Sequence, residues 1–473
     1  MTIRKSLLLS SALLVAGFAA PASAEQMTME QMQKELMKLS QQVQTLGSKV
    51  DQQNQIIQQQ DAKIAEQNAQ LEAQGKEQAE VAQTLSSIKP AAGSTGSDVK
   101  ITMNPMPKFE SSDGKYSFQP FGRVHLDATH FDDDRKDHAS NMNFRRARLG
   151  VKGNLGEDFK YKSEFEFGEE EVNFKDVYLT YTGLDPAEII LGNQKPALGL
   201  EQNTSSNYIQ LMELSPATNA FTRDEIIGAN VTTGGDNWSL AGGAFNEDAG
   251  NDDTGEDEDL SFDARGSVNL LGLAGDDSGN VLHLGAGASM RYPTGTVRFS
   301  AKPAGDGDRV VDTGSLSSVD SVNVYGLEAA GIFGPVSVQG EYFKADVNRD
   351  DGSDDAGFDG YYAQAGWFVT GEQRPYKGKT GNFDRVKPKS PFSLKDGGTG
   401  AVELVVGYSN VDLNDAGAGI TGGELSETSA GINWHLTDNI RLMGNVVAVN
   451  TDNEGVVAND DPTVYNARAQ WDF

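Results

Sequence analysis

A short basic segment stands out in an acidic sequence. The chain has 473 residues and a formal net charge of −30, yet residues 374–389, RPYKGKTGNFDRVKPK, hold six basic side chains and one acid. A lysine ammonium attracts an anion as a point charge and holds it loosely enough to release it. The segment therefore indicates either a surface that binds small anions or a contact with the phosphates of lipids.

A second group of cations lies between residues 123 and 162. Its members are Arg123, Arg145, Arg146, Arg148, Lys160 and Lys162. An arginine guanidinium holds a phosphate or carboxylate through a planar fork of donors and stays charged at any working pH. Lining a water-filled passage, such side chains would concentrate anions and guide them inward. The alternative is that they form ordinary salt bridges with Glu164, Glu166 and Asp176.

The segments that carry these cations alternate with period two, as β-strands do. In FKYKSEFEF (residues 159–167), the aromatic residues and Ser163 point one way, while two lysines and two glutamates point the other. Because the polar face carries charges of both signs, it suits a wet lumen, and the apolar face suits lipid. The pattern predicts a transmembrane β-barrel.

The end of the chain supports this interpretation. Its final stretch, TVYNARAQWDF, alternates toward a terminal aromatic residue, which resembles the assembly signal of bacterial outer-membrane barrels. The residues on the apolar face are Tyr465, Ala467, Ala469, Trp471 and Phe473. We expect an all-β transmembrane barrel of 16 antiparallel strands over residues 115–473, with ~10 residues in each strand, although 14 or 18 strands would also fit.

The residues before the barrel divide into three parts. Residues 1–24 have a basic start, a short apolar run and an A-x-A site, which predicts a secretory signal peptide. Residues 25–89 repeat apolar residues every seven positions, which predicts an α-helical coiled coil, and we favour three strands. The repeating positions are Met29, Leu36, Val43, Val50, Ile57, Ile64 and Leu71. Residues 90–114 begin with small and polar residues and are predicted to be a linker. No later run is apolar over ~18 residues, so we expect no transmembrane helix.

Motifs of enzymes and metal sites are missing from the sequence. There is no cysteine, which excludes disulfides and thiol chemistry. KGKT at residues 377–380 would end a phosphate-binding loop, but Gln373 stands where that motif needs glycine. Neither G-x-S-x-G nor H-E-x-x-H occurs. We therefore expect no enzyme, no cofactor, no metal site and no nucleic-acid partner.

The negative charge gathers in runs between the predicted strands, chiefly residues 246–263 and 346–359. They are interpreted as solvated surface loops that aid solubility, or as sites where divalent cations bridge to lipopolysaccharide. The run DVNRDD begins like a calcium loop, but Asp351 occupies the position where the turn needs glycine, so an EF-hand is rejected.

The barrel sequence resembles the phosphate-selective porin O/P family of Gram-negative outer membranes. The resemblance covers about residues 115–473 and is carried by FGRVHLD, FRRARLGVKG, LGNQKPALGLEQNTSS and GYYAQAGWFVTGEQRPYKGKTGNFDRVKPKSPF. It implies a trimer of 16-stranded barrels, each with its own pore. It also implies that Arg123, Arg145 and Arg146 are residues of an arginine ladder, and that Lys377 and Lys387 line a constriction.

One residue departs from the pattern of phosphate-selective relatives, because Asn207 stands where they have a lysine.

We expect an outer-membrane porin that prefers anions such as phosphate or polyphosphate, with a periplasmic coiled coil. The expected partners are two further copies of the chain, outer-membrane lipid and lipopolysaccharide, peptidoglycan, and small anions as permeants. Two alternatives stay open: a general or cation-preferring porin, and an envelope-spacing or adhesion protein that acts through the coiled coil.

Overall fold

The structure is a computed structural model that describes residues 99–103, 105–168, 172–246, 260–303, 309–350, 352–452 and 459–473. The predicted signal peptide and coiled coil lie outside the described residues. All described residues belong to the second of two units, Gly96–Phe473. Within this part of the chain, no helix is both long and apolar enough to cross a membrane.

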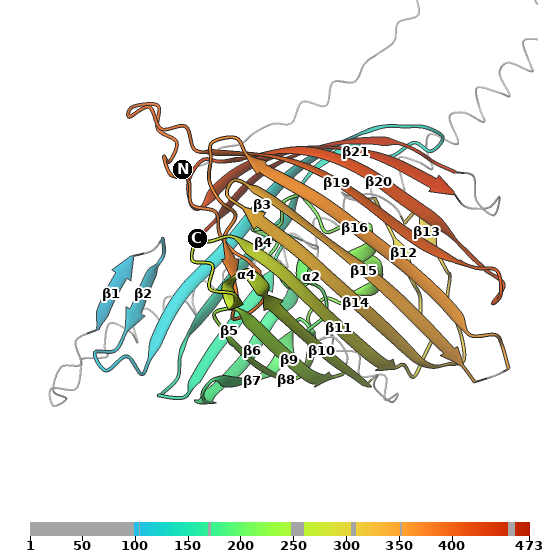
Figure 1. The fold of residues 1–473 in the computed structure, drawn as a ribbon, viewed down its shortest axis with the longest axis horizontal. Coiled ribbons are helices and arrows are strands. Elements are labelled where there is room, and N and C mark those ends of the chain that lie inside the picture. The colour runs from blue at the N-terminus through green and yellow to red at the C-terminus, as the bar shows by residue number, and fades with distance from the viewer. Residues whose placement is uncertain are drawn as a thin grey trace, which may run out of the picture. The chain divides into compact units, whose positions relative to one another are not determined.

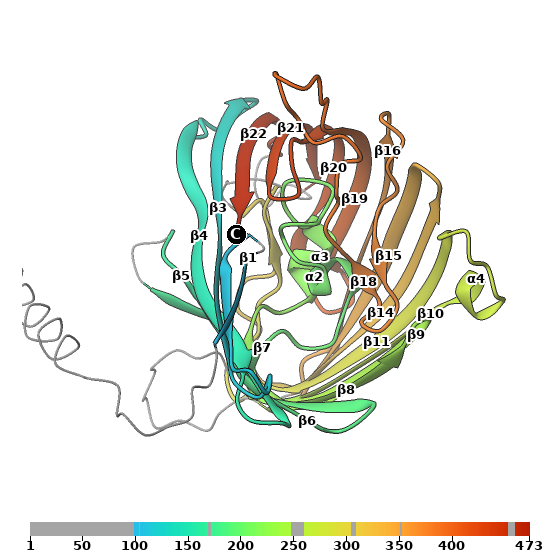
Figure 2. The same ribbon diagram turned by 90° about the vertical axis from the view of Figure 1, so that its left-hand side faces the viewer.

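Sixteen long antiparallel strands form a closed barrel (Figures 1 and 2). They are β3 (Ser117–Asp132), β4 (Asn141–Asn154), β5 (Phe159–Glu166), β6 (Asn173–Leu184), β7 (Ala187–Gln194), β8 (Ile226–Gly235), β9 (Trp238–Phe245), β10 (Leu260–Asn269), β11 (Val281–Tyr292), β14 (Val319–Phe333), β15 (Val336–Arg349), β16 (Ala356–Phe368), β19 (Ala401–Asp415), β20 (Ile420–His435), β21 (Ile440–Asp452) and β22 (Thr463–Asp472). Each strand pairs with the next long strand in sequence, and β22 pairs with β3 from Thr463↔Asp132 to Asp472↔Arg123. The predicted barrel of 16 antiparallel strands is confirmed.

The terminal residue closes the seam between the first and last strands. The N–H of Gly122 donates to the carbonyl oxygen of Phe473 at 2.9 Å, and the N–H of Phe473 donates back to Gly122 O at 3.0 Å. These bonds leave no free strand edge at this point of the seam, which a structure in hydrocarbon requires.

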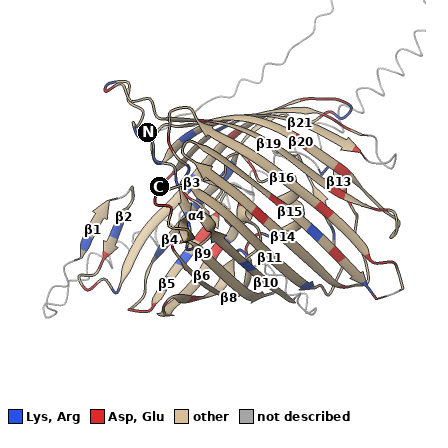
Figure 3. Cartoon of the chain, in the orientation of Figure 1, with Lys and Arg blue, Asp and Glu red and all other residues tan. Residues whose placement is uncertain are grey.

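Alternation along the strands separates a lipid-facing side from a polar interior. On β22, Tyr465 and Trp471 are exposed while Arg468 and Gln470 are buried inside. Charged residues occur along many strands, as Figure 3 shows. Because an inward charge is surrounded by other polar groups of the lumen, it is compatible with the same strand that presents an aromatic residue to lipid.

Several short elements accompany the barrel. A hairpin of β1 (Lys100–Met103) and β2 (Pro107–Glu110) precedes β3, within the region predicted to be a linker. Helix α4 (Leu270–Leu273) lies in the connection from β10 to β11, and strands β12 (Ser300–Ala301) and β13 (Val311–Asp312) lie in the connection from β11 to β14.

Two long connections fold into the barrel from opposite ends. The third loop, residues 195–225, connects β7 to β8 and contains helices α2 (Leu200–Asn203) and α3 (Pro216–Phe221). Figure 2 shows both helices inside the ring of strands. The long turn, residues 369–400, connects β16 to β19 and contains β17 (Tyr376–Lys377) and β18 (Asn382–Phe383). Because the strands alternate in direction, the long turn enters at the end where β3 begins and β22 ends, and the third loop enters at the other end.

An aromatic cluster fixes the third loop against the strands. Phe221 of α3 packs on Phe343 of β15 with ring centroids 6.1 Å apart, and on Phe299 at 5.9 Å. Phe299 in turn packs on Phe358 of β16 at 5.2 Å. The apolar core of the molecule therefore lies inside the barrel, between the loops and one part of the wall.

Candidate functional site

Part of what holds the third loop inside the barrel is a set of hydrogen bonds from inward side chains to its backbone. Arg441 of β21 donates to the carbonyl oxygen of Ile209 at 2.8 Å, and Arg468 of β22 donates to that of Met212 at 2.5 Å. Asn433 of β20 donates to Gln210 O at 2.8 Å. A backbone without regular structure must find such partners when it is buried, and the inward polar side chains supply them.

The long turn is bound in the same way by the opposite side of the lumen. Arg265 of β10 donates to the carbonyl oxygens of Gly381 at 2.7 Å and Thr380 at 3.2 Å. Asn382 donates to the carbonyl oxygen of Asn203 on α2 at 2.9 Å, which joins the long turn to the third loop. The tip of the turn is tight, with Gly381 at φ +61°.

Arg374 and Gln210 lock the two connections together. Arg374 donates to Gln210 Oε1 at 2.7 Å, and its guanidinium stacks on the ring of Phe383 at 3.4 Å. The Gln210 amide donates in turn to Glu403 at 2.6 Å and to Ser337 at 3.0 Å. Burial lowers the pKa of Arg374 to about 10, which still leaves it cationic at neutral pH.

Charged side chains from the strands, the third loop and the long turn surround a cavity of about 570 Å³. Eight of its lining residues are cations: Arg123, Arg145, Arg146, Arg148, Lys162, Lys175, Lys195 and Lys377. Seven are carboxylates: Glu164, Glu166, Asp176, Glu213, Asp224, Glu225 and Asp384. The lining therefore carries a formal net charge of +1 within a protein of net charge −30.

Most of these cations contact a carboxylate directly. Four such pairs are Arg123–Glu164 at 2.9 Å, Arg148–Glu166 at 2.7 Å, Lys175–Glu225 at 3.4 Å and Lys377–Asp384 at 3.0 Å. Lys162 lies between two acids, Glu164 at 3.1 Å and Asp176 at 2.5 Å. The salt bridges that the sequence analysis gave as the alternative to anion binding are therefore present. The electrostatic field in the cavity depends on which cations remain exposed to solvent.

The structure brings together six of the eight residues predicted to line the pore and separates the other two. Arg123, Arg145, Arg146, Arg148, Lys162 and Lys377 line the cavity. Lys160 lies outside the cavity lining and pairs with Glu188 at 3.3 Å. Lys387 is also outside the lining and is exposed.

Sequence reasoning missed two lining cations, Lys175 and Lys195. Lys195 follows directly after β7, where the chain turns into the third loop, and its ammonium donates to Gln202 O at 2.8 Å. Burial lowers its pKa, although the acids Glu225 and Asp224 act in the opposite direction. The basic residue in LGNQKPALGL is the sequence signal, but it points to the lumen only once the end of β7 is known.

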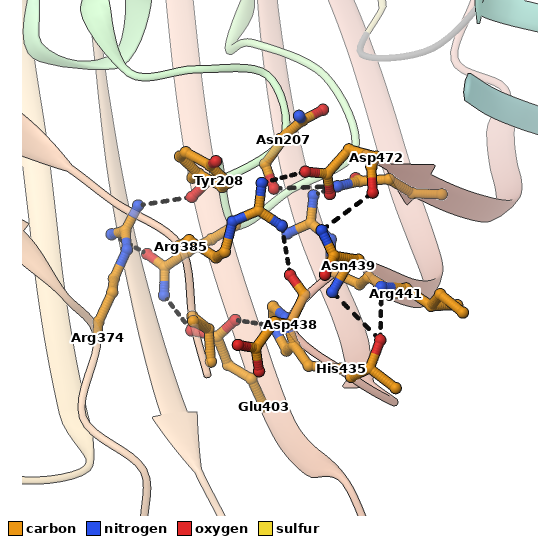
Figure 4. A pocket seen from close by; sticks show the side chains of 15 residues that line it. Asn207, Tyr208, Arg374, Arg385, Glu403, His435, Asp438, Asn439, Arg441 and Asp472 are labelled. Carbon is orange, nitrogen blue, oxygen red and sulfur yellow. Dashed lines mark hydrogen bonds and ion pairs between the residues drawn. The ribbon is translucent and has the colours of Figure 1, made fainter. Parts of the chain in front are cut away.

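A second, much smaller cavity lies where the third loop meets the long turn and the β20–β21 connection, as Figure 4 shows. Its volume is about 20 Å³, room for roughly one water molecule. Arg385 donates to the carbonyl oxygen of Asp438 at 2.5 Å and pairs with Asp472, while its guanidinium faces the Tyr208 ring at 5.3 Å. These contacts seal this side of the third loop against the wall.

Comparisons with known proteins agree with this architecture. The sequence profile of the family described as phosphate-selective porin O and P matches residues 118–473. The chain is 28% identical over 423 residues to Porin O of Pseudomonas aeruginosa, which covers 80% of this chain and 93% of that protein. It is 30% identical over 418 residues to an uncharacterized protein of Caulobacter vibrioides, covering 84% of this chain and 82% of that one.

Solved structures of porins align with the barrel at low sequence identity. An anion-selective porin from Comamonas acidovorans aligns at a TM-score of 0.46 and 13% identity, covering 76% of this chain and 100% of that one. Family match and closed barrel together indicate an outer-membrane channel rather than an enzyme. The protein belongs to the phosphate-selective porin O and P family of outer-membrane porins.

Proposed function

We propose that this porin is a passive pore that prefers small anions, with phosphate or polyphosphate among its permeants. The observation that carries the proposal is the cavity between the third loop, the long turn and the wall, with eight cations in its lining. Two of these cations are the most open to solvent among those whose salt bridges are described. The exposed fractions of their side chains are 56% for Lys377 and 29% for Arg145.

The two exposed cations act differently on a passing anion. Lys377 attracts it as a point charge and releases it readily, whereas the Arg145 guanidinium offers a planar fork of N–H donors. The paired cations contribute hydrogen-bond donors rather than net charge, because the carboxylate beside each one neutralises its positive charge. Such a lining replaces part of the hydration shell of an anion without trapping it, as passive transport requires.

The charges of the cavity lining also support a second candidate function, a general or cation-preferring pore. Asn207, which stands where phosphate-selective relatives have a lysine, is buried and meets His125 Nε2 through its amide oxygen at 3.0 Å. It therefore brings no positive charge to the cavity. Seven carboxylates in the lining and acidic loops outside favour cations.

Assembly and orientation complete the proposal. The end at which β3 begins and β22 ends faces the periplasm. The coiled coil predicted over residues 25–89 is a periplasmic segment that joins three copies of the chain. Lipopolysaccharide surrounds the opposite end, and peptidoglycan is the candidate contact of the coiled coil. Deleting residues 25–89 should leave conduction intact if the main function is a pore, and should abolish the phenotype if it is envelope spacing.

The deciding experiment is the reversal potential of the purified protein in a planar bilayer under a tenfold KCl gradient, repeated with phosphate added. Preference for chloride over potassium, with phosphate either carried or reducing the chloride current, would support the proposal. A preference for potassium that phosphate does not affect would favour the second candidate.

A further inference from the structure

One carboxylate of the third loop occupies a cluster of three arginines. Glu213 is buried, with only 9% of its surface exposed. Its Oε1 and Oε2 accept from the two terminal nitrogens of Arg146 at 2.7 and 3.0 Å. Arg145 donates to Oε2 at 3.1 Å, and Arg468 donates to Oε1 at 2.5 Å. Four donors from three guanidiniums thus meet one carboxylate.

The three arginines are not equally committed to Glu213. Arg468 has a carboxylate of its own, because it also binds both oxygens of Asp127 at 2.7 and 2.6 Å. Among the described residues, Glu213 is the only carboxylate within salt-bridge distance of Arg145 and Arg146. Without Glu213, these two guanidiniums would lose their only neutralising partner in this part of the chain.

This cluster belongs to the lining of the larger cavity. Glu213, Arg145 and Arg146 all line the cavity of about 570 Å³, as does Arg123, which donates to the hydroxyl of Ser206 at 2.9 Å. Paired guanidinium forks recognise phosphate oxygens with the same geometry that they use for a carboxylate. The site is thus built for an oxyanion and already holds one that belongs to the chain.

We propose that Glu213 is a tethered competitor, which occupies an oxyanion site in the wall of the pore and prevents permeant phosphate from resting there. It is thereby a specificity-determining residue for the anion pathway. With Glu213 in place, anions pass Arg145 without meeting two guanidiniums whose N–H donors are free to bind them. With its charge removed, Arg145 and Arg146 form a site that retains inorganic phosphate and slows the chloride current.

The inference rests on the proposed function, since it assumes that anions reach the cavity. Its test compares two variants that remove the same charge from the same lining, Glu213→Gln and Glu225→Gln. Glu225 contacts a lysine rather than the arginines, with Lys175 Nζ at 3.4 Å, and is equally buried. Both variants should shift the reversal potential toward anions, so this measurement alone does not separate them.

The separating measurement is the block of single-channel chloride current by inorganic phosphate. We expect Glu213→Gln to be blocked at a phosphate concentration about tenfold or more below that needed for the wild type. Glu225→Gln should match the wild type. Adding Arg145→Ala to Glu213→Gln should remove the block, because the exposed arm of the site is lost.

Each other outcome has a clear meaning. If Glu213→Gln only enlarges the conductance, the residue is an anchor of the third loop and the inference is overturned. Equal block in both single variants would also overturn it, since charge alone would then explain the effect. Should Glu213→Gln fail to assemble, Glu213→Asp keeps the charge but withdraws it by one methylene, and it must show a weaker block of the same kind. A potassium-selective wild type would contradict the proposed function but not a block that appears only in Glu213→Gln.

Discussion

Around the cavity of about 570 Å³, individual cations differ in how much of their charge they can offer to a permeant. Arg148 is bound to Glu166 at 2.7 Å, and only 12% of its side chain is exposed. Lys377 is bound to Asp384 at 3.0 Å, yet 56% of its side chain is exposed. Because an exposed ion pair in water is weak, Lys377 can leave Asp384 for a passing anion more easily than Arg148 can leave Glu166.

This difference predicts unequal effects of the two lysines of the long turn. Lys377→Ala should lower the chloride-to-potassium permeability ratio by about threefold, as expected for one partly screened charge near the permeation path. Lys387→Ala removes the same charge from the same segment but outside the cavity lining, so it should leave the ratio unchanged. Reversal potentials of both variants check this, and a larger effect of Lys387→Ala would mean that the passage runs along another face of the turn.

The Glu213 carboxylate should keep its charge in acid. Burial acts to raise its pKa, but the guanidiniums of Arg146, Arg145 and Arg468 outweigh burial and hold the pKa well below its ordinary value. The charged form therefore stabilises the attached loop. That contribution is fully present above the ordinary pKa and is lost only as the pH falls through the lowered value.

We accordingly expect the single-channel conductance to show no step between about pH 7 and about pH 4, the range in which ordinary carboxyls begin to titrate. The charged and titratable groups around Glu213 are Arg145, Arg146 and Arg468, with His125 and Asp127 behind them. Glu213→Gln is the control, since it cannot titrate at this position. A sudden rise in wild-type conductance near pH 5 would show that the arginines hold the loop less firmly than their distances indicate.

Alternation predicted the polar face on which several wall cations lie, but it did not distinguish those that line the cavity from Lys160, which lies outside the lining. Arg123, Arg148 and Lys162 lie on the polar face that the sequence predicted, and their partners Glu164 and Glu166 are close in the register of β4 and β5. The contacts of Arg145 and Arg146 with Glu213 join residues more than sixty positions apart. No periodicity encodes such a contact, because it depends on how an irregular loop returns through the barrel.

At the scale of elements, the third loop and the long turn support each other from opposite ends of the barrel. Gln210 of the third loop accepts from Arg374 of the long turn and donates to Glu403 of β19. The third loop contains no β-strand, and the long turn contains only the short pair β17 and β18. Buried polar contacts therefore fix the position of both connections. Loss of one contact leaves a buried group unpaired, which costs about 1–3 kcal/mol.

The tip of the long turn provides a test of this packing. Gly381 has φ +61°, and an added Cβ would lie 2.1 Å from Ser267 Oγ and 2.7 Å from Ser239 Oγ. Gly275 has φ +85° with open space around it. Gly381→Ala and Gly275→Ala thus share the cost of a left-handed alanine, about 1–2 kcal/mol, but only the first adds a steric clash with the wall.

Gly381→Ala should therefore displace the tip of the long turn, change the single-channel conductance and make the turn more sensitive to protease. Gly275→Ala should alter neither. Conductance recordings and limited proteolysis of the two folded variants check the expectation. Equal behaviour would show that the tip is free to move without a change in the conducting path.

The strands were predictable because their residues meet two different solvents, and the internal elements were not. The alternation in β5 and β22 follows directly from lipid on one side and water on the other. The hairpin of β17 and β18 has no lipid-facing side, because Tyr376 and Phe383 pack against an apolar cluster inside the protein while Lys377 faces the cavity. The β1–β2 hairpin likewise lies in a stretch whose opening composition suggested a linker.

At the scale of the whole molecule, the outer wall of the barrel carries a group of three acids on neighbouring strands. Asp359, Asp412 and Glu424 lie opposite one another on β16, β19 and β20. Each is on the face that points away from the internal core, since its neighbours Phe358, Val411 and Leu425 belong to that core. Tyr361 of β16 is exposed two residues nearer the middle of the wall. Tyrosine belts mark the edge of the hydrocarbon, so these acids belong to the headgroup layer.

Acids outside the cavity lining, among them Asp350, Asp354, Asp359, Asp412 and Glu424, predict an unusual salt dependence. At about 0.01 M salt the Debye length is ~30 Å, so the field of distant acidic loops reaches the passage and opposes anions. At about 1 M it is ~3 Å, and only side chains that line the cavity act on a permeant. Because that lining has a formal net charge of +1, the preference for chloride should rise with salt, whereas a pore controlled by an unpaired cationic ring would lose selectivity.

Reversal potentials under the same tenfold gradient at low and high mean salt test this directly. Asp350→Asn combined with Asp354→Asn, in the connection between β15 and β16, provides the control because it removes two exposed acids that do not belong to the cavity lining. The variant should shift the low-salt value toward chloride and leave the high-salt value unchanged. A chloride preference that declines as salt rises, unaffected by these substitutions, would mean that the lining cations act over long distances despite their carboxylate partners. The view of a nearly neutralised cavity lining would then have to be given up.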